Sequence, residues 1–134
     1  MRTETFRIDT RAGRVHDLTD RVVRFAGDVG GDGLLLVFVP HATAGVALME
    51  IGSGSESDLD ELLERMLPRD DRYAHRHGPV GHGGDHLLPV LVPSSLLLPV
   101  TGGVVQLGTW QSVVLIDPNR ENDVRTVRLS FVAG

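Results

Sequence analysis

The 134-residue chain contains no cysteine, which excludes disulfide bonds, thiolate zinc sites and cysteine nucleophiles. It also lacks lysine, so that all 13 basic side chains are arginines and Schiff-base chemistry is excluded. No apolar run approaches the roughly 20 residues of a membrane-spanning helix. The first residues, Met1–Arg7, lack the apolar segment of a signal peptide. We therefore expect a soluble cytoplasmic protein with no membrane partner.

The charge and length of the chain bear on its partners and on the number of domains. A formal net charge of −5 argues against a nucleic-acid partner, because nucleic-acid-binding surfaces are basic. The length suits one domain over residues 1–134 and leaves no room for two. Such a domain buries about two thirds of its unfolded surface, so its core needs no disulfide or structural metal.

Hydrophobic patterning predicts an α+β domain, in which a largely β architecture is flanked by helices. We expect strands over residues 4–8, 34–39, 46–50, 96–100, 104–107, 112–116 and 124–132. The continuous apolar run Leu34–Val39 is typical of a strand buried on both faces. Thr101-Gly102-Gly103 indicates a hairpin. The last strand alternates apolar and polar residues, as expected of a sheet with one wet face.

Three helices are expected, over residues 16–25, after Ser57, and over 86–92. The second has the clearest pattern, an apolar stripe made by Leu59, Leu62, Leu63, Met66 and Leu67. Ser57 is predicted as its N-cap, with Asp60 in a capping box, and Pro68 as its end. The segment from Arg69 to Gly84 reads as a long polar loop, of a length that is often functional or disordered.

Histidines are the main candidates for chemistry. His41 follows the apolar strand and begins the segment His41-Ala42-Thr43-Ala44-Gly45; the plainer alternative is a histidine that hydrogen-bonds a loop carbonyl. Four more lie within twelve residues: His75, His77, His82 and His86. Three imidazoles and a water make a common zinc site. No standard spaced motif is present, however, so the spacing alone favours a flexible, solvated histidine-rich loop, an interpretation that His77 and His82 fit best.

Carboxylates and one aromatic residue complete the candidates. Glu50 ends the strand after His41, and Asp58 opens the predicted helix. Carboxylates beside imidazoles build acid–base and metal sites, although a carboxylate at a helix start is usually only a favourable dipole partner. Trp110, the only tryptophan, is expected in the core by default, but its polar neighbours Thr109 and Gln111 interrupt an apolar β run and suggest a site.

These segments, taken together, resemble the YjbQ-type family, often called secondary thiamine-phosphate synthase. The matching elements are His41–Val46 ending at Glu50, the acidic Asp58, Tyr73-Ala74-His75, His86, and the unchanged run Leu107-Gly108-Thr109-Trp110-Gln111. The resemblance implies a compact α+β subunit with a mixed, mostly antiparallel sheet, assembled as a homotrimer. It also implies a histidine cleft near a subunit interface that binds a metal such as zinc, and a weak thiamine phosphate synthase activity.

Several residues depart from the family pattern. Met49 and Ile51 stand where the family has asparagines, Ser53 or a neighbour stands where it has an aspartate, and Leu88 replaces a lysine. A cation at that last position would hold a phosphate. One of three arginines, Arg72, Arg76 or Arg120, would have to substitute for it. We therefore expect this chain to share metal binding with the family more readily than catalysis.

Three hypotheses follow. In the first, an enzyme with a divalent-metal cofactor carries out thiamine phosphate synthesis or a looser metal-assisted hydrolysis. Its metal ligands are His41, His75 and His86; its catalytic carboxylates are Glu50 and Asp58; and its substrate-binding residues are Thr43, Thr109, Trp110 and Gln111. In the second, the same pocket binds a small molecule without turnover, which the apolar Met49, Ile51 and Leu88 favour. In the third, the histidines of a trimer are scattered.

Overall fold

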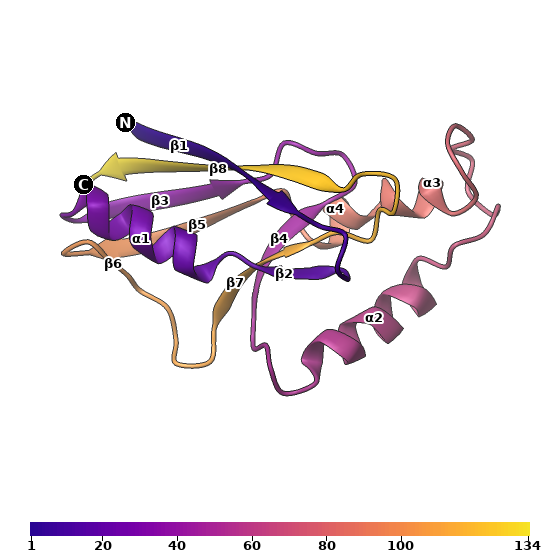
Figure 1. Cartoon of the computed structure of the whole chain (residues 1–134), viewed down its shortest axis with the longest axis horizontal. Helices are drawn as coiled ribbons and strands as arrows, with labels where there is room; N and C mark the ends of the chain where they lie inside the picture. Colours follow the sequence, from indigo (N-terminus) through magenta and orange to yellow (C-terminus); the bar gives the residue numbers. More distant parts are fainter.

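The computed structural model describes residues 1–134, which form eight strands and four helices (Figure 1). The strands are β1 (Arg2–Asp9), β2 (Val15–Asp17), β3 (Gly33–Phe38), β4 (Gly45–Met49), β5 (Ser95–Thr101), β6 (Val104–Val105), β7 (Ser112–Ile116) and β8 (Val124–Ala133). The helices are α1 (Thr19–Val29), α2 (Ser55–Met66), α3 (His82–Asp85) and α4 (Leu88–Leu91). The expected α+β class is confirmed. None of the helices combines the length and the apolar character needed to cross a membrane.

The strands form two sheets. One has the order β1-β8-β3-β5-β6 and the other the order β2-β7-β4. Every pairing is antiparallel, so the expectation of a mixed sheet is wrong. In β8, Val127, Leu129 and Phe131 are buried, whereas Arg128 is exposed. One face of this inner strand therefore lies on the core.

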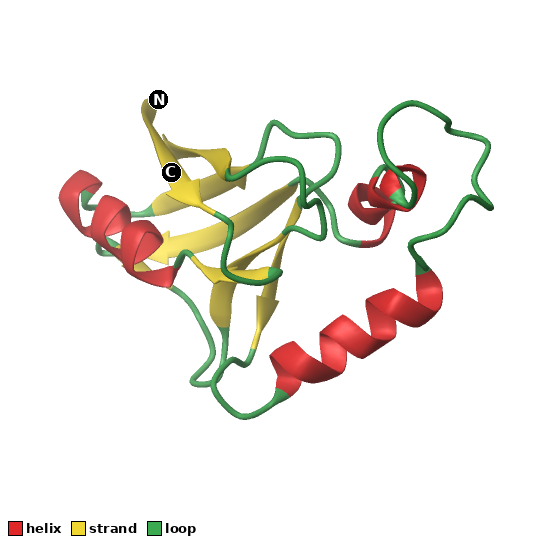
Figure 2. Cartoon of the chain, turned by 45° about the vertical axis from the view of Figure 1, so that its right-hand side comes forward, coloured by secondary structure: helices red, strands yellow, loops and turns green.

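The two sheets and α1 share one apolar core. Its 18 buried residues come from α1 and from both sheets, among them Phe25, Leu35, Val46, Leu115 and Leu129. Burial of this size supplies most of the stabilisation of a domain, at about 25 cal/mol per Å² of apolar surface. A second cluster has only four buried residues. It joins α2 and α4 to β7, and α2 stands at the side of the sheets (Figure 2).

The start of the first helix was predicted too early. Helix α1 begins at Thr19, and the residues before it form β2, which pairs with β7 through Val15 and Ile116. The Asp17 carboxylate accepts hydrogen bonds from the backbone N–H and the hydroxyl of Thr19, at 2.9 and 2.6 Å. The pairing with β7 joins residues about a hundred positions apart, so local helical spacing did not reveal it.

Strand β3 is not buried on both faces. Leu35 and Val37 are fully buried, but Leu34 is 44% exposed. Both of its neighbours, β5 and β8, are antiparallel, and antiparallel sheets commonly leave one face toward solvent. The exposed outer face also carries Leu97 and Val132, at 59% and 51% exposure. Alternate side chains of the apolar run thus face the core, and the others lie on the outer face of the sheet.

The cap predicted for the second helix is also wrong. Helix α2 begins at Ser55 after Gly54, which has a φ of 101°, so that Ser57 and Asp60 lie inside the helix. The Glu56 carboxylate accepts the backbone N–H of Gly52 and closes the entry turn. Of the predicted apolar stripe only Leu63 is fully buried. Leu62 and Met66 are 42% and 51% exposed, because the helix meets the body along one narrow edge.

The expected loop over 69–84 is interrupted at its end by α3, and the short helix expected over 86–92 is reduced to α4. The strand expected over 104–107 is reduced to β6, which still pairs with β5 as a hairpin through Val105 and Val100. The short helices α3 and α4 lead from the end of the loop back to β5 (Figure 1). This arrangement carries the histidine-rich segment beside the sheets.

Candidate functional site

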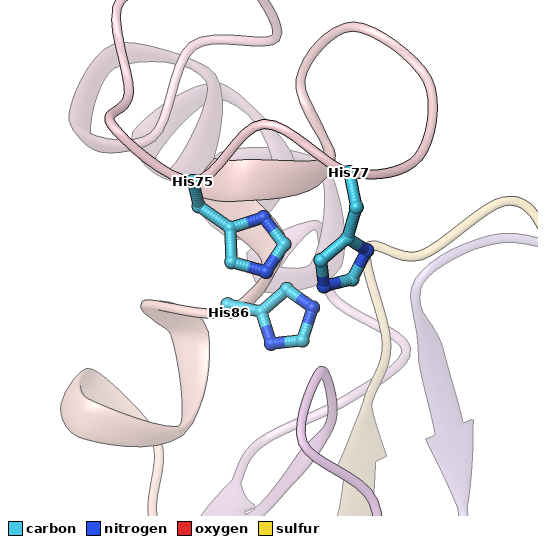
Figure 3. Close-up of side chains that lie close together, drawn as sticks. All are labelled: His75, His77 and His86. Atoms are coloured by element: carbon cyan, nitrogen blue, oxygen red, sulfur yellow. The ribbon is translucent and has the colours of Figure 1, made fainter.

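Three histidines of the segment between His75 and His86 point their rings toward one another. Ring nitrogens of His75, His77 and His86 all lie within 4.8 Å of one another. The rings of His75 and His77 have centroids 3.9 Å apart, and those of His75 and His86 stack at 4.2 Å. Figure 3 shows the three side chains converging from the loop above and from the chain after α3. Convergent imidazole nitrogens are the donor set of a transition-metal site.

Glycines in α3 explain why the loop lies against this helix. A Cβ at Gly83 would come within 2.7 Å of the Tyr73 Cβ and 3.1 Å of the His75 carbonyl oxygen, and one at Gly84 within 2.8 Å of the Tyr73 hydroxyl oxygen. The same hydroxyl donates a hydrogen bond to the Pro68 carbonyl at 2.8 Å. Only residues without a side chain allow Tyr73 to pack this closely. Tyr73 thereby anchors the chain that carries His75 and His77.

Burial and the neighbouring imidazoles both act on the protonation of the cluster. Partial burial, followed by the nearby histidines, lowers the pKa of His75 and of His86 below the ordinary 6.5. A lowered pKa keeps an imidazole neutral at pH 7, and only a neutral imidazole can ligate a metal. In addition, the Nδ1 atom of His75 is buried without a hydrogen-bond partner. The donors present therefore fit a divalent transition metal such as zinc.

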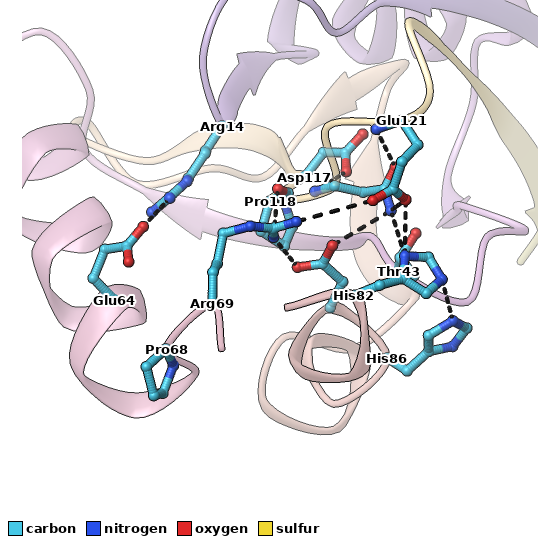
Figure 4. A network of polar contacts seen from close by, with 12 residues as sticks. Arg14, Thr43, Glu64, Pro68, Arg69, His82, His86, Asp117, Pro118 and Glu121 are labelled. Atoms are coloured by element: carbon cyan, nitrogen blue, oxygen red, sulfur yellow. Dashed lines mark hydrogen bonds and ion pairs between the residues drawn. The ribbon is translucent and has the colours of Figure 1, made fainter. Parts of the chain in front are cut away.

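A polar network adjoins His86 through His82 (Figure 4). His82 Nδ1 lies 2.8 Å from the Glu121 carboxylate, and His82 Nε2 lies 2.9 Å from His86 Nε2. The Asn119 side-chain amide donates to Glu121 at 2.7 Å. The buried Asp85 pairs with Arg69 at 2.5 Å, and burial raises the pKa of this carboxyl despite the opposing effect of Arg69. The network links α3 to the segment after β7.

His41 is not among the three converging histidines, and Thr43 belongs to the polar network of Figure 4. His41 Nε2 accepts the backbone N–H of Thr126 at 2.9 Å, and burial, followed by Arg125, lowers the pKa of His41. Thr43 is buried, and its hydroxyl accepts a hydrogen bond from Arg125 at 2.8 Å. Arg125 also forms a buried ion pair with Asp117. The two residues connect the chain after β3 to β8, and His41 belongs to neither group of candidate ligands.

The predicted catalytic carboxylates lie at the opposite end of α2. Glu50 follows β4 and Asp58 lies in the first turn of the helix, and both are exposed. The histidine loop follows the other end of α2, whose 12 residues span about 18 Å. The structure therefore does not bring Glu50 or Asp58 to the histidines.

The predicted substrate-binding run forms an exposed loop between β6 and β7. Trp110 is 73% exposed, so the default expectation of a core tryptophan is wrong. The Gln111 side chain accepts the backbone N–H of Gly108 at 2.8 Å and closes the loop, while Thr109 is exposed beside it. Pairing of Met49 with Ser112 places this loop beside the end of β4, which Glu50 follows.

A polar groove of about 740 Å³ separates α2 from the segment after β7. Its 14 lining residues include no hydrophobic side chain. Arg14 crosses it to Glu64. Arg120 also lines the groove and forms no ion pair within 4.0 Å, although Glu64 lies near enough for Arg120 to help lower the pKa of that carboxyl. By contrast, Arg72 is held by Asp70, which leaves Arg120 as the better placed of these two for an anion.

Sequence reasoning left His77 and His82 undecided and did not select Arg69, Asn119 or Glu121. The spacing of His82 and His86, four residues apart, was the available signal, since such pairs share one face of a helix. No local pattern connects Glu121 to His82 across 39 positions. Their contact depends on β7 carrying the Pro118–Asp123 turn back to α3.

Comparison with known proteins agrees with the resemblance seen in the sequence. The family model described as "UPF0047 protein YjbQ-like" matches residues 4–134. UPF0047 protein Rv2556c of Mycobacterium tuberculosis is 57% identical over 134 residues, which is 100% of both chains. A UPF0047 protein of Archaeoglobus fulgidus is 33% identical over 102 residues, covering 75% of this chain and 78% of the relative.

Solved structures show the same fold. The hypothetical protein APE1520 of Aeropyrum pernix superposes with a TM-score of 0.89 at 32% identity, over 100% of both chains. A protein of Sulfolobus solfataricus, SSO2532, described as YbjQ-like and of unknown function, superposes with a TM-score of 0.91 at 21% identity, over 99% of this chain and 97% of that one. The second likeness bears on the fold alone.

Proposed function

This chain belongs to the UPF0047 family of YjbQ-like proteins, and from that premise we propose that it binds a divalent metal, zinc in the first instance, through His75, His77 and His86. We propose further that it acts in the cytoplasm on a small anionic molecule. The observation that carries the proposal is the convergence of three ring nitrogens within 4.8 Å. His77 thus takes the place that sequence reasoning gave to His41.

The chemistry of the donors supports an anionic substrate. A metal bound here would act as a Lewis acid on a phosphate or carbonyl oxygen. Neutral imidazoles leave the double positive charge of the ion uncompensated, which favours an anionic ligand. The specific reaction to assay is thiamine phosphate synthesis, in which a pyrimidine pyrophosphate and a thiazole phosphate are joined and pyrophosphate is released. Both of its substrates carry phosphate groups.

We also propose that the protein is a homotrimer in which each site combines groups from two subunits. In one subunit the histidines lie beyond one end of α2, while Glu50 and Trp110 lie near its other end. An indole that is 73% exposed and an outer sheet face with Leu34, Leu97 and Val132 exposed are typical of surfaces that a partner covers. The neighbouring subunit would then supply Trp110, Thr109 and Gln111 as substrate-binding residues.

Binding without turnover is the second candidate, and one observation favours it. The two carboxylates in the network around His82 are already engaged by other groups. Asp85 is paired with Arg69, and Glu121 already faces His82 and Asn119. A pocket of this kind would retain a metal and a ligand but would lack the group that moves a proton.

Elemental analysis of untagged protein tests metal binding. We expect near-stoichiometric metal in the wild type and loss of metal in His75→Ala, His77→Ala and His86→Ala. His16→Ala is the matched control, because His16 lies in β2 and hydrogen-bonds the Gly13 carbonyl at 3.1 Å. Metal-free wild-type protein, with all the variants folded, would overturn the proposal.

Pyrophosphate release, with and without metal, then separates the two candidates. Release that requires His86 supports the transferase, whereas ligand binding without release supports the binder.

Mixing His86→Ala and Trp110→Ala subunits after dissociation tests the shared site. A mixture that is more active than either variant supports it, and a monomeric mass in light scattering would contradict it.

A further inference from the structure

A fourth histidine beside the cluster has no role in the function proposed above. The side chain of His82 is only 13% exposed, although it stands in a short helix at the end of a polar segment. His86 follows four residues later with φ of −71° and ψ of −14°, which continues the helical path. His82 and His86 therefore lie on one face, one turn apart, in the arrangement by which helical histidine pairs hold zinc.

The contacts of His82 orient one of its ring nitrogens toward the cluster. Its Nδ1 lies 2.8 Å from the Glu121 carboxylate oxygen. The donor-only amide nitrogen of Asn119 lies farther from the same Nδ1, at 3.3 Å. In the tautomer that satisfies the closer carboxylate, Nδ1 carries the proton and the lone pair of the neutral ring lies on Nε2. This Nε2 lies 2.9 Å from His86 Nε2. Ligating histidines characteristically donate their other ring N–H to a carboxylate, which fixes the ring and raises its basicity.

The distance between the two Nε2 atoms agrees with a shared ion. Nitrogens bound at 2.0–2.1 Å to one zinc lie about 2.9 Å apart at a right angle and about 3.4 Å apart at a tetrahedral angle. The ring of His82 also lies 5.3 Å from that of His77 and 5.6 Å from that of His75, centroid to centroid. His82 thus adjoins the three converging histidines through His86, while one of its nitrogens lies in a second group, with Asp85 and Glu121.

We propose that His82 is a fourth imidazole ligand of the metal site, oriented by Glu121. This rests on the proposed function, because it concerns the same ion. A site of four imidazoles contributes no negative charge, so any further ligand of a metal with a free position is expected to be an anion, such as phosphate or carboxylate. Glu121 acts as a positioning residue, and Asn119 holds it through a hydrogen bond of 2.7 Å.

An alternative grouping of the same residues is less suited to a cation. Oxygens of Asp85 and Glu121 and a ring nitrogen of His82 also lie within 4.8 Å of one another. However, the Arg69 guanidinium pairs with the Asp85 carboxylate at 2.5 Å. A second dication there would face this fixed positive charge, so the ion pair directs a metal toward the imidazoles rather than toward Asp85.

Long-range ¹H–¹⁵N spectra of ¹⁵N-histidine-labelled, chelator-treated protein titrated with Zn²⁺ test the inference on the wild type. The chain has six histidines, and metal ligation shifts the nitrogen that binds. We expect one shifted nitrogen on each of His75, His77, His82 and His86, and none on His16 or His41, which serve as internal controls. Shifts on only three imidazoles, with His82 unchanged, would overturn this inference and leave the proposed function intact.

Affinities provide the second measurement. We expect His82→Ala to weaken Zn²⁺ binding at least as much as Glu121→Gln, which should weaken it about tenfold by removing the carboxylate behind a ligand. A His82→Ala affinity within twofold of the wild type would overturn the inference. A wild type that binds no Zn²⁺ would remove both this inference and the proposed function. Circular dichroism of each metal-free variant separates loss of a ligand from loss of fold.

Discussion

The two-sheet body and the segment that carries the histidines are held together by different forces. The body has 18 buried apolar residues in one cluster, whereas the cluster beneath α2 and α4 has four. Around the histidines, hydrogen bonds and ion pairs replace apolar burial, as in the contacts of Arg69 with Asp85 and of Tyr73 with Pro68. The body is therefore built for stability, and the histidine segment for placing polar groups.

This difference separates stability from function within one chain. Apolar burial is additive over many residues and tolerant of local change. A polar cluster depends on a few contacts with fixed geometry, and it leaves donor atoms free for a ligand. We expect core substitutions to change the free energy of unfolding while the histidine geometry survives, and substitutions around α3 to change ligand binding first.

The largest expected effect is in the body. Leu98→Ala removes a side chain that is 3% exposed and should lower the free energy of unfolding by about 2–5 kcal/mol. Leu97→Ala is the matched control on the same strand, where the side chain is 59% exposed in the single chain, and we expect about 0.5 kcal/mol or less at a protein concentration at which the chain is monomeric. Urea denaturation measures both. Equal effects at that concentration would contradict a one-sided sheet.

Metal should stabilise the protein through the histidine segment. Zn²⁺ at about one hundred times its dissociation constant stabilises the folded state by about 2.7 kcal/mol, provided that the unfolded chain does not bind it. We expect a higher melting temperature with Zn²⁺ in the wild type and in Leu98→Ala, but no rise in His75→Ala. A rise in His75→Ala equal to that of the wild type would place the ion elsewhere.

A single methyl group should disturb the site without removing a ligand. In Gly83→Ala the new Cβ meets the Tyr73 Cβ at 2.7 Å, and overpacking of this kind costs about 1–3 kcal/mol. We expect weaker Zn²⁺ binding by titration calorimetry. Gly27→Ala in α1 is the control, because its Cβ meets nothing within 4 Å and a helical alanine is neutral or stabilising. Unchanged affinity in Gly83→Ala would separate Tyr73 packing from the site.

The smallest effect is a pH dependence from the body. Burial, followed by Arg125, lowers the pKa of His41 below its ordinary 6.5. Between the folded and unfolded pKa values the unfolded chain binds more protons, so stability rises with pH through this window and is lost as pH falls. In His41→Gln, metal-free, we expect a shallower dependence of the urea midpoint below pH 6.5. An identical slope would show that His41 contributes nothing to it.

Much of the fold follows from local patterns. The strands around Phe6, Leu35, Val46, Val113 and Leu129 were predicted because their apolar residues alternate or form short runs between turns. Errors occurred where long-range pairing or local capping decided the outcome. Strand β2 exists because it pairs with β7, and α2 begins at Ser55 because the positive φ of Gly54 and the Glu56 carboxylate set its entry.

The candidate site was harder to predict from the sequence than the fold. Composition excluded thiolate and lysine chemistry, and the density of histidines between His75 and His86 located the segment. The sequence could not select members of the cluster, because ring convergence depends on how Tyr73 packs on Gly83 and Gly84. For the same reason His41, at the end of a strand, was grouped with histidines from which it is separate within the subunit.

By itself the sequence determined the α+β class, the family resemblance and the residue types available for chemistry, because these depend on periodicity, on matching runs such as Leu107–Gln111 and on composition. Only the tertiary structure decided which of those residues meet. It brought Glu121 to His82 and placed Trp110 on the surface. These long-range contacts depend on the path of the chain between strands and on close packing at glycines, and neither leaves a local pattern in the sequence.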